Sequence, residues 1–542
     1  MSGNFRYGGY AGKFLRVNLT TGDIKDEPLP VEWAERYLGG LGLAARLLYD
    51  EIPRGVDPFD EGNKVAIFTG PCEGTYVPTA SRIGVYTKSP LTGAFFHSSA
   101  GGHFAPELKY AGWDGILIEG KAERPVYIWI QDERVEIRDA SAYWGLETFP
   151  AQEKLREDLG CPEAQVGCIG PAGEKKVRFA ATIFGVRAAG RGGGGAVIGS
   201  KNLKAIAVRG TGAIAVPDTE ELNRVLKDLY ERVTSHPVTG KGLPTYGTPA
   251  IVMTNNKMGI LGTRNWQTEY FPEAEKIGAE HFKETIWRKH KGCFACPVYC
   301  GKYSVVREGP LKGTVVEGPE YEDLFSLGSL CGVSEIRAVA RGERRCDDLG
   351  LDAIEAGVVV AFAMEAYERG ILSEEAAGGL ELRFGNWEAM LELIELMGRR
   401  EGLGAMLADG LVPAADCLGG GAHDFAMHHR GLGMAGHTSR GLPGMALGYA
   451  TGPRGGSHHD GKGPYTAGLN NLMAITDSMI ICHMTEPIYG PIAPNDMVPA
   501  VINAVTGMKL SMDEANETAD RIWTLTRCHL MREGYRRKDD TL

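Results

Sequence analysis

Three cysteines stand close together in Cys293-Phe-Ala-Cys296-Pro-Val-Tyr-Cys300, a C-x2-C-x3-C pattern. Thiolates at this spacing can face one centre. A complete [4Fe–4S] shell needs four cysteines, so the fourth must come from elsewhere in the chain. Zinc also accepts four cysteines, or three cysteines and one histidine, but its motifs usually come as two separated pairs. The motif therefore favours an iron–sulfur cluster over zinc, and three buried cysteines without a metal remain the third alternative.

The other cysteines form no comparable group. The chain has 11 cysteines in 542 residues, an odd number that is thinly spread. This is not the pattern of a disulfide framework. Most of them are expected to be small buried hydrophobic residues.

Two segments combine arginine with glycine in a way that suits a phosphate-bearing cofactor. One runs from Arg82 to Gly102, and the other is Arg187-Ala-Ala-Gly-Arg-Gly-Gly-Gly-Gly-Ala-Val-Ile-Gly. Glycine lets backbone N–H groups approach an anion, and arginine supplies a forked pair of donors. Neither segment fits the P-loop or dinucleotide-binding glycine patterns, so a nucleotide site is not supported. Taken alone, each segment is also compatible with a surface loop that has a basic flank.

The elements that must position these motifs change character along the chain. β-branched and aromatic runs bounded by turn residues predict strands at 13–19, 64–68, 82–86, 115–119, 126–130, 134–137 and 204–209. Beyond Gly210 the period becomes helical, and Asp218 or Thr219 is predicted to cap a helix that runs toward Val233. Further helices are predicted over 336–349, 352–369, 387–401, 403–417 and 512–532. We therefore place domain boundaries near residues 211 and 415.

Composition and charge exclude several classes of protein. The chain is 43% hydrophobic with a net charge of −11, and an acidic chain without a basic run is a poor nucleic-acid binder. No stretch of 18 apolar residues appears, so no membrane span is expected. The N-terminus lacks the apolar core of a signal peptide, which predicts a cytoplasmic protein.

A series of further motifs follows one order along the chain. They are Thr87-Lys-Ser-Pro-Leu-Thr-Gly, Gly101-Gly-His-Phe-Ala-Pro-Glu-Leu-Lys-Tyr-Ala-Gly-Trp-Asp, Arg187-Ala-Ala-Gly-Arg-Gly-Gly, the cysteine motif, Glu317-Gly-Pro-Glu-Tyr-Glu, Asp347-Asp-Leu-Gly-Leu-Asp352, Arg454-Gly-Gly-Ser-His and Asp477-Ser-Met-Ile-Ile-Cys482. With these motifs the chain resembles the aldehyde:ferredoxin oxidoreductase family of tungstopterin enzymes over nearly its whole length.

The resemblance implies an α+β multidomain fold. A β-rich pterin-binding base domain is expected over residues 1–210. A mostly helical domain with the cysteine motif follows over 211–415, and a second mostly helical domain with the fourth cluster cysteine over 416–542. The implied cofactors are a [4Fe–4S] cluster and two molybdopterin dithiolenes that hold one tungsten or molybdenum through four sulfurs. An Mg²⁺ ion is expected to bridge the two pterin phosphates through backbone carbonyls.

The resemblance also assigns residues to these cofactors. By position in the family motifs, the cluster ligands are Cys293, Cys296, Cys300 and Cys482. The pterin-binding positions are Arg82, Ser99, Ala100, Gly101, Arg187, Ala188, Asp347, Leu351, Asp352, Asp477 and Ile481. Ser99 stands where the family often has asparagine, and Ile481 replaces a leucine. A carbonyl ligand to magnesium would survive the change at Ser99.

Two side chains match positions near the metal and are candidates for the chemistry. They are Glu322, which follows Tyr321, and His458, which follows Arg454-Gly-Gly-Ser. A carboxylate can take a proton from water or substrate, and a histidine can polarise a carbonyl oxygen. Glu320 competes with the glutamate for this role, while His437 and His459 compete with the histidine.

The function implied by the resemblance is oxidation of an aldehyde to a carboxylic acid, with electrons passing through the cluster to ferredoxin or an iron–sulfur partner subunit. One alternative is the catalytic subunit of a tungsten-dependent acyl-CoA or carboxylate reductase complex. Another is an iron–sulfur electron-transfer subunit without pterin. A zinc-stabilised structural protein is the most distant alternative. A homo- or hetero-oligomer is left open.

Three departures from the family pattern bear on these expectations. The E-x-x-H motif that binds a metal between subunits in some members is absent before Asp347, where the sequence is Arg341-Gly-Glu-Arg-Arg-Cys. This weakens the case for a metal-bridged homodimer. The chain is shorter than many relatives between His458 and Asp477, a stretch that helps shape the path by which substrate enters. The polar segments His428-His-Arg and His458-His-Asp-Gly leave room for a polar or charged substrate.

Overall fold

Two six-stranded mixed sheets form the N-terminal third of the protein. The computed structural model describes residues 5–460 and 467–542. The strands of the first sheet, in spatial order, are β2 (Ile24–Pro28), β1 (Lys13–Asn18), β6 (Gly115–Glu119), β3 (Val65–Phe68), β4 (Ile83–Lys88) and β5 (Phe95–Ala100). Those of the second are β11 (Arg187–Ala189), β10 (Thr182–Phe184), β9 (Gln165–Cys168), β12 (Leu203–Arg209), β7 (Val126–Gln131) and β8 (Arg134–Asp139).

The predicted strands are confirmed, but the region is less purely β than expected. Each predicted run overlaps one strand: β1, β3, β4, β6, β7, β8 or β12. The unpredicted helices are α1 (Val31–Tyr37), α2 (Gly40–Glu51), α3 (Phe104–Tyr110), α4 (Thr148–Asp158), α5 (Pro171–Glu174) and α6 (Gly194–Ser200). Helix α6 begins inside the glycine run of the second glycine–arginine segment. There Gly195 is essential because a Cβ would lie 2.1 Å from the carbonyl oxygen of Ala181.

The two sheets share a buried core and meet at their edges. Ile67 of the first sheet and Ile128 and Ile206 of the second belong to one buried apolar cluster. The last strand of the first sheet, β5, contacts the first strand of the second, β11. Because the glycine–arginine segments lie on these strands, the sheet order brings together two motifs that are far apart in the sequence.

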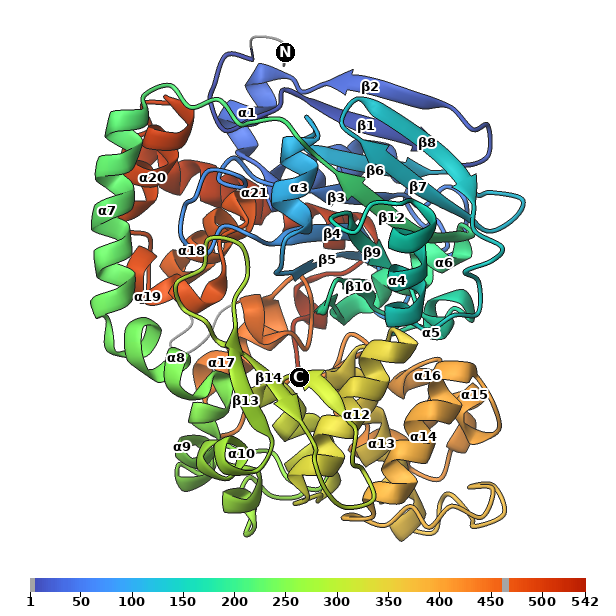
Figure 1. Ribbon diagram of the computed structural model, residues 1–542. Coiled ribbons are helices and arrows are strands. Elements are labelled where there is room, and N and C mark those ends of the chain that lie inside the picture. Colours follow the sequence, from blue (N-terminus) through green and yellow to red (C-terminus); the bar gives the residue numbers. More distant parts are fainter. Residues whose placement is uncertain (1–4, 461–466) are drawn as a thin grey trace.

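The rest of the chain is mostly helical, which confirms the predicted fold class (Figure 1). Helix α7 (Thr219–Ser235) is capped by Asp218, whose carboxylate accepts from two backbone N–H groups. Helices α12 (Ile336–Leu349) and α21 (Met512–Arg532) have the bounds that the sequence predicted. Helix α13 (Ala353–Glu368) is apolar on nearly all sides and lies in the core of the middle region.

One segment predicted as a single continuous helix is broken in the structure. The segment 403–417 contains two helices, α15 (Leu403–Leu407) and α16 (Leu411–Leu418). The break is at Gly410, which has a φ of 88° and precedes α16. An L-residue rarely adopts this φ, so the glycine ends one helix and starts the next in a new direction.

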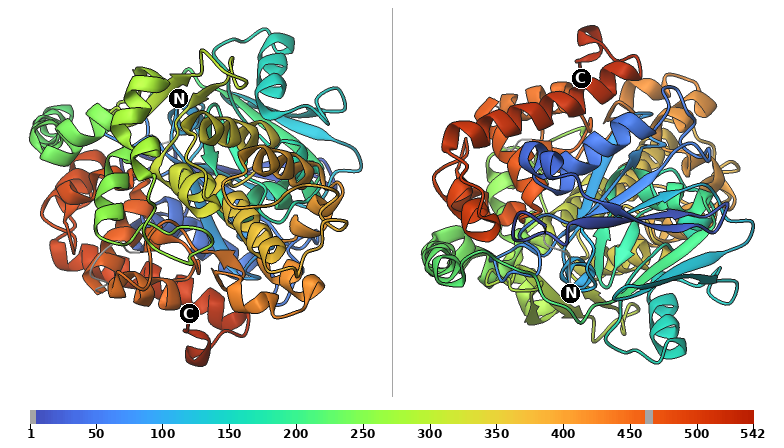
Figure 2. Two further views of the ribbon diagram at one scale, coloured as in Figure 1. Left: turned by 90° about the horizontal axis from the view of Figure 1, so that it is seen from below. Right: turned by 90° about the horizontal axis from the view of Figure 1, so that it is seen from above.

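The C-terminal helices return to the N-terminal sheet. Helix α18 (Ala467–Met479) contacts both α2 and α21, and α21 contacts α2. Figure 2 (right) shows α21, in red, running past the blue N-terminal helices. The chain therefore closes over the first sheet from both ends of the sequence. Among the described residues, no helix has the length and apolarity needed to cross a membrane.

Candidate active site

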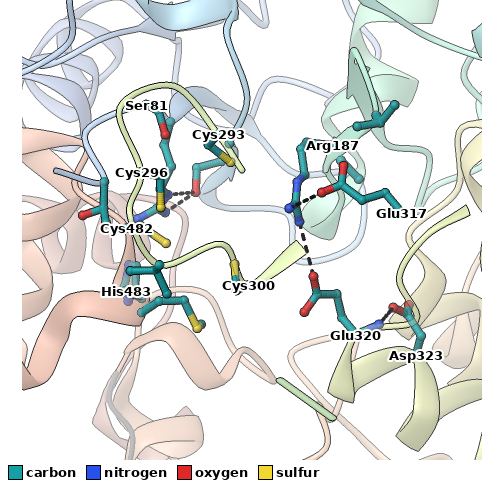
Figure 3. A pocket seen from close by; sticks show the side chains of 18 of the residues that line it. Ser81, Arg187, Cys293, Cys296, Cys300, Glu317, Glu320, Asp323, Cys482 and His483 are labelled. Atoms are coloured by element: carbon teal, nitrogen blue, oxygen red, sulfur yellow. Dashed lines mark hydrogen bonds and ion pairs between the residues drawn. The ribbon is translucent and has the colours of Figure 1, made fainter. Parts of the chain in front are cut away.

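A cavity of about 310 Å³ lies where the two sheets, the cysteine loop and the C-terminal region meet (Figure 3). This size falls in the usual range for small-molecule sites. Its lining includes all four predicted cluster cysteines and most of the predicted pterin positions: Cys293, Cys296, Cys300, Cys482, Arg82, Ser99, Gly101, Arg187, Ala188, Asp347 and Leu351. The structure thus brings together motifs from five separate parts of the sequence.

The cysteines come from two segments. Three lie on the loop between β13 (Trp287–Lys291) and β14 (Gly301–Val305). Cys482 follows α18, and its backbone N–H donates to the carbonyl of Thr79 at 3.2 Å. A β-bridge between Ala80 and Ile481 fixes the same segment. The fourth cysteine is therefore held against the first sheet by backbone hydrogen bonds.

The spacing of the cysteines distinguishes between the two candidate metals. Within the described residues, no three of their Sγ atoms lie within 4.8 Å of one another. Two sulfurs on one zinc ion lie at most about 4.6 Å apart, since each Zn–S bond is about 2.3 Å. In a [4Fe–4S] cluster each cysteine binds a different iron, so the sulfurs are spread around a larger body. The arrangement fits a cluster better than a single zinc ion.

Gly101 is required because the cysteine loop packs directly on it. A Cβ at this position would lie 2.8 Å from Sγ of Cys293. The next residue, Gly102, accepts a hydrogen bond from the backbone N–H of Phe294 at 3.0 Å. The first glycine–arginine segment therefore contacts the cluster loop through its glycines.

Arg82 joins the first segment to the Asp477 motif. Its guanidinium donates to Oγ of Ser99 at 3.0 Å, to the carbonyl of Ile481 at 2.9 Å and to the carboxylate of Asp477 at 3.1 Å. The same carboxylate is 3.1 Å from Nε2 of His97 and 2.8 Å from Nε2 of His483. Although burial opposes ionisation, these partners, His483 and Arg82 foremost, hold the pKa of Asp477 well below its usual range. Asp477 is a buried, ionised and well-partnered carboxylate.

Arg187, on the other side of the cavity, faces a surplus of carboxylates (Figure 3). It pairs with Glu317 and with Glu320, the latter at 3.3 Å. Asp323, Glu343 and Asp347 line the same side. Burial raises the pKa of Asp323 and Glu343 well above the usual range, and raises the pKa of Asp347 to about 7.

Two oxygens on this side lack hydrogen-bond partners. Among the described residues, Oε2 of Glu317 and Oε2 of Glu343 have no partner although both atoms are buried. Buried polar atoms are nearly always hydrogen-bonded, so these carboxyl oxygens are ready to bond to a bound group, as acceptors or, when protonated, as O–H donors. A pterin ring carries N–H donors. The donor set of the cavity therefore fits the cofactors that the sequence predicted.

The D-x-x-G-L-D motif is the junction of α12 and α13. Gly350 has a φ of 73° and ends α12, which places Asp347 and Leu351 at the cavity. Asp352 is not among the lining residues. Its carboxylate caps α13 at the backbone N–H of Ile354 and is 3.2 Å from Nε of Arg191.

Other predicted pterin positions support the cavity wall rather than line it. Ala100 pairs with Ile83 in the sheet, Asp477 holds Arg82, and Ile481 offers its carbonyl to the same arginine. Sequence reasoning missed Arg191, which is buried between Asp352 and Glu355. Its position within the second glycine–arginine segment was the available signal. Also missed were Thr79, Ser81, His483 and Met484, which line the cavity together with His459, a residue that the sequence offered only as a competitor of His458.

The two predicted catalytic side chains lie together, apart from the cavity lining. Oε1 of Glu322 is 3.6 Å from Nδ1 of His458 and 3.5 Å from Nε2 of His437. The backbone N–H of Gly436 donates to Oε2 of the same glutamate at 2.8 Å. The competing Glu320 points instead to Arg187 and Thr248. One carboxylate and two imidazoles therefore converge, and His437 joins the predicted pair.

Comparison with family models covers most of the chain. Residues 14–210 match the N-terminal domain of aldehyde ferredoxin oxidoreductase, and residues 224–542 match its domains 2 and 3. The chain is 40% identical to the tungsten-containing aldehyde ferredoxin oxidoreductase of Pyrococcus abyssi, over 98% of this chain and 91% of that one.

Two further relatives carry names that point to other substrates. The chain is 34% identical to the WOR-like subunit of an aliphatic sulfonate oxidoreductase of Pyrococcus furiosus, over 97% of this chain and 86% of that one. A solved structure, the active-site complex BamBC of benzoyl coenzyme A reductase with 1,5-dienoyl-CoA, superposes with a TM-score of 0.86 at 26% identity. That match covers 99% of this chain and 91% of the solved one. The full-length matches show that this chain belongs to the aldehyde ferredoxin oxidoreductase family.

Proposed function

We propose that this protein is a tungsten or molybdenum bis-pterin oxidoreductase that oxidises an aldehyde to a carboxylic acid. The electrons would leave through a [4Fe–4S] cluster to ferredoxin or an iron–sulfur partner subunit. The observation that carries the proposal is the presence of Cys482 in the same cavity as the C-x2-C-x3-C motif, between two arginine-bearing loops. Relatives named as tungsten-containing aldehyde ferredoxin oxidoreductases support the metal and the substrate class.

We assign a part of the chain to each group. Cys293, Cys296, Cys300 and Cys482 would hold the cluster. The two loops at β5 and β11 would hold the pterin phosphates, and residues 99–101 and 187–188 would supply backbone carbonyl ligands to Mg²⁺. The carboxylates on the Arg187 side would accept hydrogen bonds from a pterin ring. When bound, the metal centre supplies the two-electron chemistry, and the protein supplies position and electrostatics.

The overall reaction is RCHO + H2O → RCOO⁻ + 2e⁻ + 3H⁺. Glu322 is the proposed base, because its carboxylate is held by Gly436 and approached by two imidazoles. Its task is to take a proton from the water or the substrate. His458 and His437 would polarise the carbonyl oxygen and keep the carboxylate oriented.

Metal content tests the cofactor assignment. Protein purified without oxygen from a tungsten-replete native host should contain about one W or Mo and about four Fe per chain, the content of one [4Fe–4S] cluster. Iron without W or Mo would favour an electron-transfer subunit. Zinc alone would overturn the assignment.

Substitution of Glu322 tests the chemistry. Glu322→Gln should lower turnover of an aldehyde with a viologen acceptor by about 100-fold or more, because general bases contribute 10²–10⁴-fold. Glu284→Gln, at an exposed glutamate outside the cavity lining, is the control and should keep most of the turnover per bound metal. Full activity of Glu322→Gln at unchanged metal content would remove it as the base. Turnover of an acyl-CoA but of no aldehyde would favour a reductase function like that of the solved relative, a benzoyl coenzyme A reductase.

A further inference from the structure

The cysteine loop carries exposed aromatic side chains on its outer side. Phe294, between two of the cluster cysteines, has ring neighbours at 5.5 Å in Tyr76, 6.3 Å in Tyr110 and 6.4 Å in His103. Tyr76 is 67% exposed, and Tyr299 of the same loop is 50% exposed. Large exposed aromatic residues are enriched at protein interfaces, since they bury much area at little loss of side-chain freedom.

The backbone holds these two tyrosines in an unusual conformation. Tyr76 has a φ of 60° and Tyr299 a φ of 49°. Bulky residues rarely adopt positive φ, and such strain tends to persist at functional sites. The ring of Tyr299 lies against Gly292, where a Cβ would be 2.9 Å from the ring. The conformation thus displays the ring on the surface against Gly292, the residue that follows Lys291 in the chain.

A basic strand adjoins these aromatic rings. In β13, Lys289, His290 and Lys291 are exposed. Neither lysine has a carboxylate within 4.0 Å among the described residues. The nearby carboxylates of Glu107 and Glu317 are paired with Arg209 and Arg187. In a chain of net charge −11, this is a local surplus of positive charge.

The basic strand and the cluster site are continuous. A second cavity of about 210 Å³ is lined by Lys291, His103 and Cys293 together, on the outer side of the cysteine loop. The side chains that face solvent here therefore lie beside the cluster ligands. Electrons that leave a cluster at this place have a short way to the surface.

From these observations we infer that the aromatic–basic surface, formed by Tyr76, His103, Lys289, Lys291, Phe294 and Tyr299, is the docking site of an acidic iron–sulfur electron carrier. The inference rests on the proposed function and deepens it by naming where the acceptor binds. An acidic carrier is repelled by the chain as a whole. A local positive patch overcomes this repulsion at short range, because salt screens charges beyond about 10 Å, and it orients the carrier toward the cluster.

Charge reversal tests the docking site on the holoenzyme. The variant K289E/K291E is compared with K175E/K227E, which makes the same charge change at two other exposed lysines that pair with no carboxylate within the described part of the chain. The measurement is calorimetric binding of an oxidised, acidic [4Fe–4S] ferredoxin at low and at physiological ionic strength. K289E/K291E should weaken binding by about tenfold at low salt and less at higher salt, while the control pair stays near wild type. Tyr76→Ser should weaken binding at both ionic strengths alike.

Turnover and association state complete the test. Aldehyde turnover with a viologen acceptor should be unchanged in both variants, because a small acceptor does not need the docking surface. Equal ferredoxin affinity of the two double variants, or no binding by wild type, would overturn the inference. So would a change from dimer to monomer in K289E/K291E with ferredoxin binding intact, which would make this surface an interface between copies of the chain. Absence of wild-type aldehyde turnover would count against the proposed function alone, since binding is measured without turnover.

Discussion

The two sides of the cofactor cavity contain similar residues but differ in how their charges are paired. Each side has an arginine and an aspartate from a D-x-x motif. On the Arg82 side, Asp477 is buried, ionised and held by one guanidinium and two imidazoles. On the Arg187 side, several carboxylates share one arginine, and Asp347 has a raised pKa.

The difference shows which side pairs its own charges without a ligand. The Arg82 side pairs its charges and ties the first sheet to the C-terminal region, although Nδ1 of His97 is buried without a hydrogen-bond partner among the described residues. The Arg187 side keeps neutral acids and unpartnered acceptor oxygens facing the cavity. The first side is therefore a structural brace, and the second is the side that gains most from a bound group that donates hydrogen bonds.

The largest effect is expected from Asp477→Asn in cofactor-free protein. The substitution leaves Arg82, only 11% exposed, without its carboxylate. Breaking a buried pair by removal of one partner costs about 3–5 kcal/mol. Because the pKa of Asp477 is depressed, the loss should be full above about pH 4 and fade at lower pH. The check is the free energy of unfolding in urea, with Asp409→Asn, in a more exposed pair, as control at less than about 1 kcal/mol.

The same aspartate-to-asparagine change on the Arg187 side should have the opposite effect on the stability of the protein. Asp347 has a folded-state pKa of about 7 against an ordinary value of 3.8. The folded state therefore binds more protons in this window, so stability falls as pH rises through it. Asp347→Asn removes that loss and should stabilise the cofactor-free protein by up to about 4 kcal/mol above pH 7, and by nothing below about pH 4.

Asp348 provides the matched control for this prediction. It pairs with Arg344 and Arg345, so Asp348→Asn should destabilise by about 1.5–3 kcal/mol. If Asp347→Asn and Asp348→Asn both destabilised the protein at neutral pH, the carboxylates of the Arg187 side would be as well paired as Asp477. The contrast between the two sides of the cavity would then be refuted.

The smallest effects are expected from the hydroxyl groups on each side. Ser99→Ala removes an acceptor for the Arg82 guanidinium, worth about 2 kcal/mol because the donor is charged. Thr148→Val removes a neutral hydrogen bond to the backbone carbonyl of Asp347, worth about 1 kcal/mol. Urea unfolding of the two variants measures the difference. Equal losses would argue against Arg82 as the main brace.

Local signals predicted part of the fold very well. The bounds of α12 and α21 follow from their ends: Glu335 caps one and Gly350 ends it, while Ser511 and Glu514 form a capping box on the other. The break at Gly410 was missed, since a single glycine inside an apolar period also fits a continuous helix. Helices α1 to α6 were hidden among strand-like runs. The domain boundaries near 211 and 415 remain predictions.

The site was predictable as a set of motifs but not as a geometry. The cysteine spacing names the three neighbouring ligands, whereas the place of Cys482 depends on its backbone contact with Thr79. The roles of Arg191 and His437 depend on partners far along the chain, which no local pattern reveals. The shortened stretch between His458 and Asp477 includes residues 461–466, which lie outside the described residues.

The contact of β5 with β11 has a consequence for solubility. Both are terminal strands of their sheets, and unpaired strand edges are templates for aggregation. Here β5 and β11 lie against each other, so their contact shields both strand edges from other molecules. A substitution that separated β5 from β11 would expose both edges together. Its effect would appear first as self-association of the protein, before any loss of secondary structure.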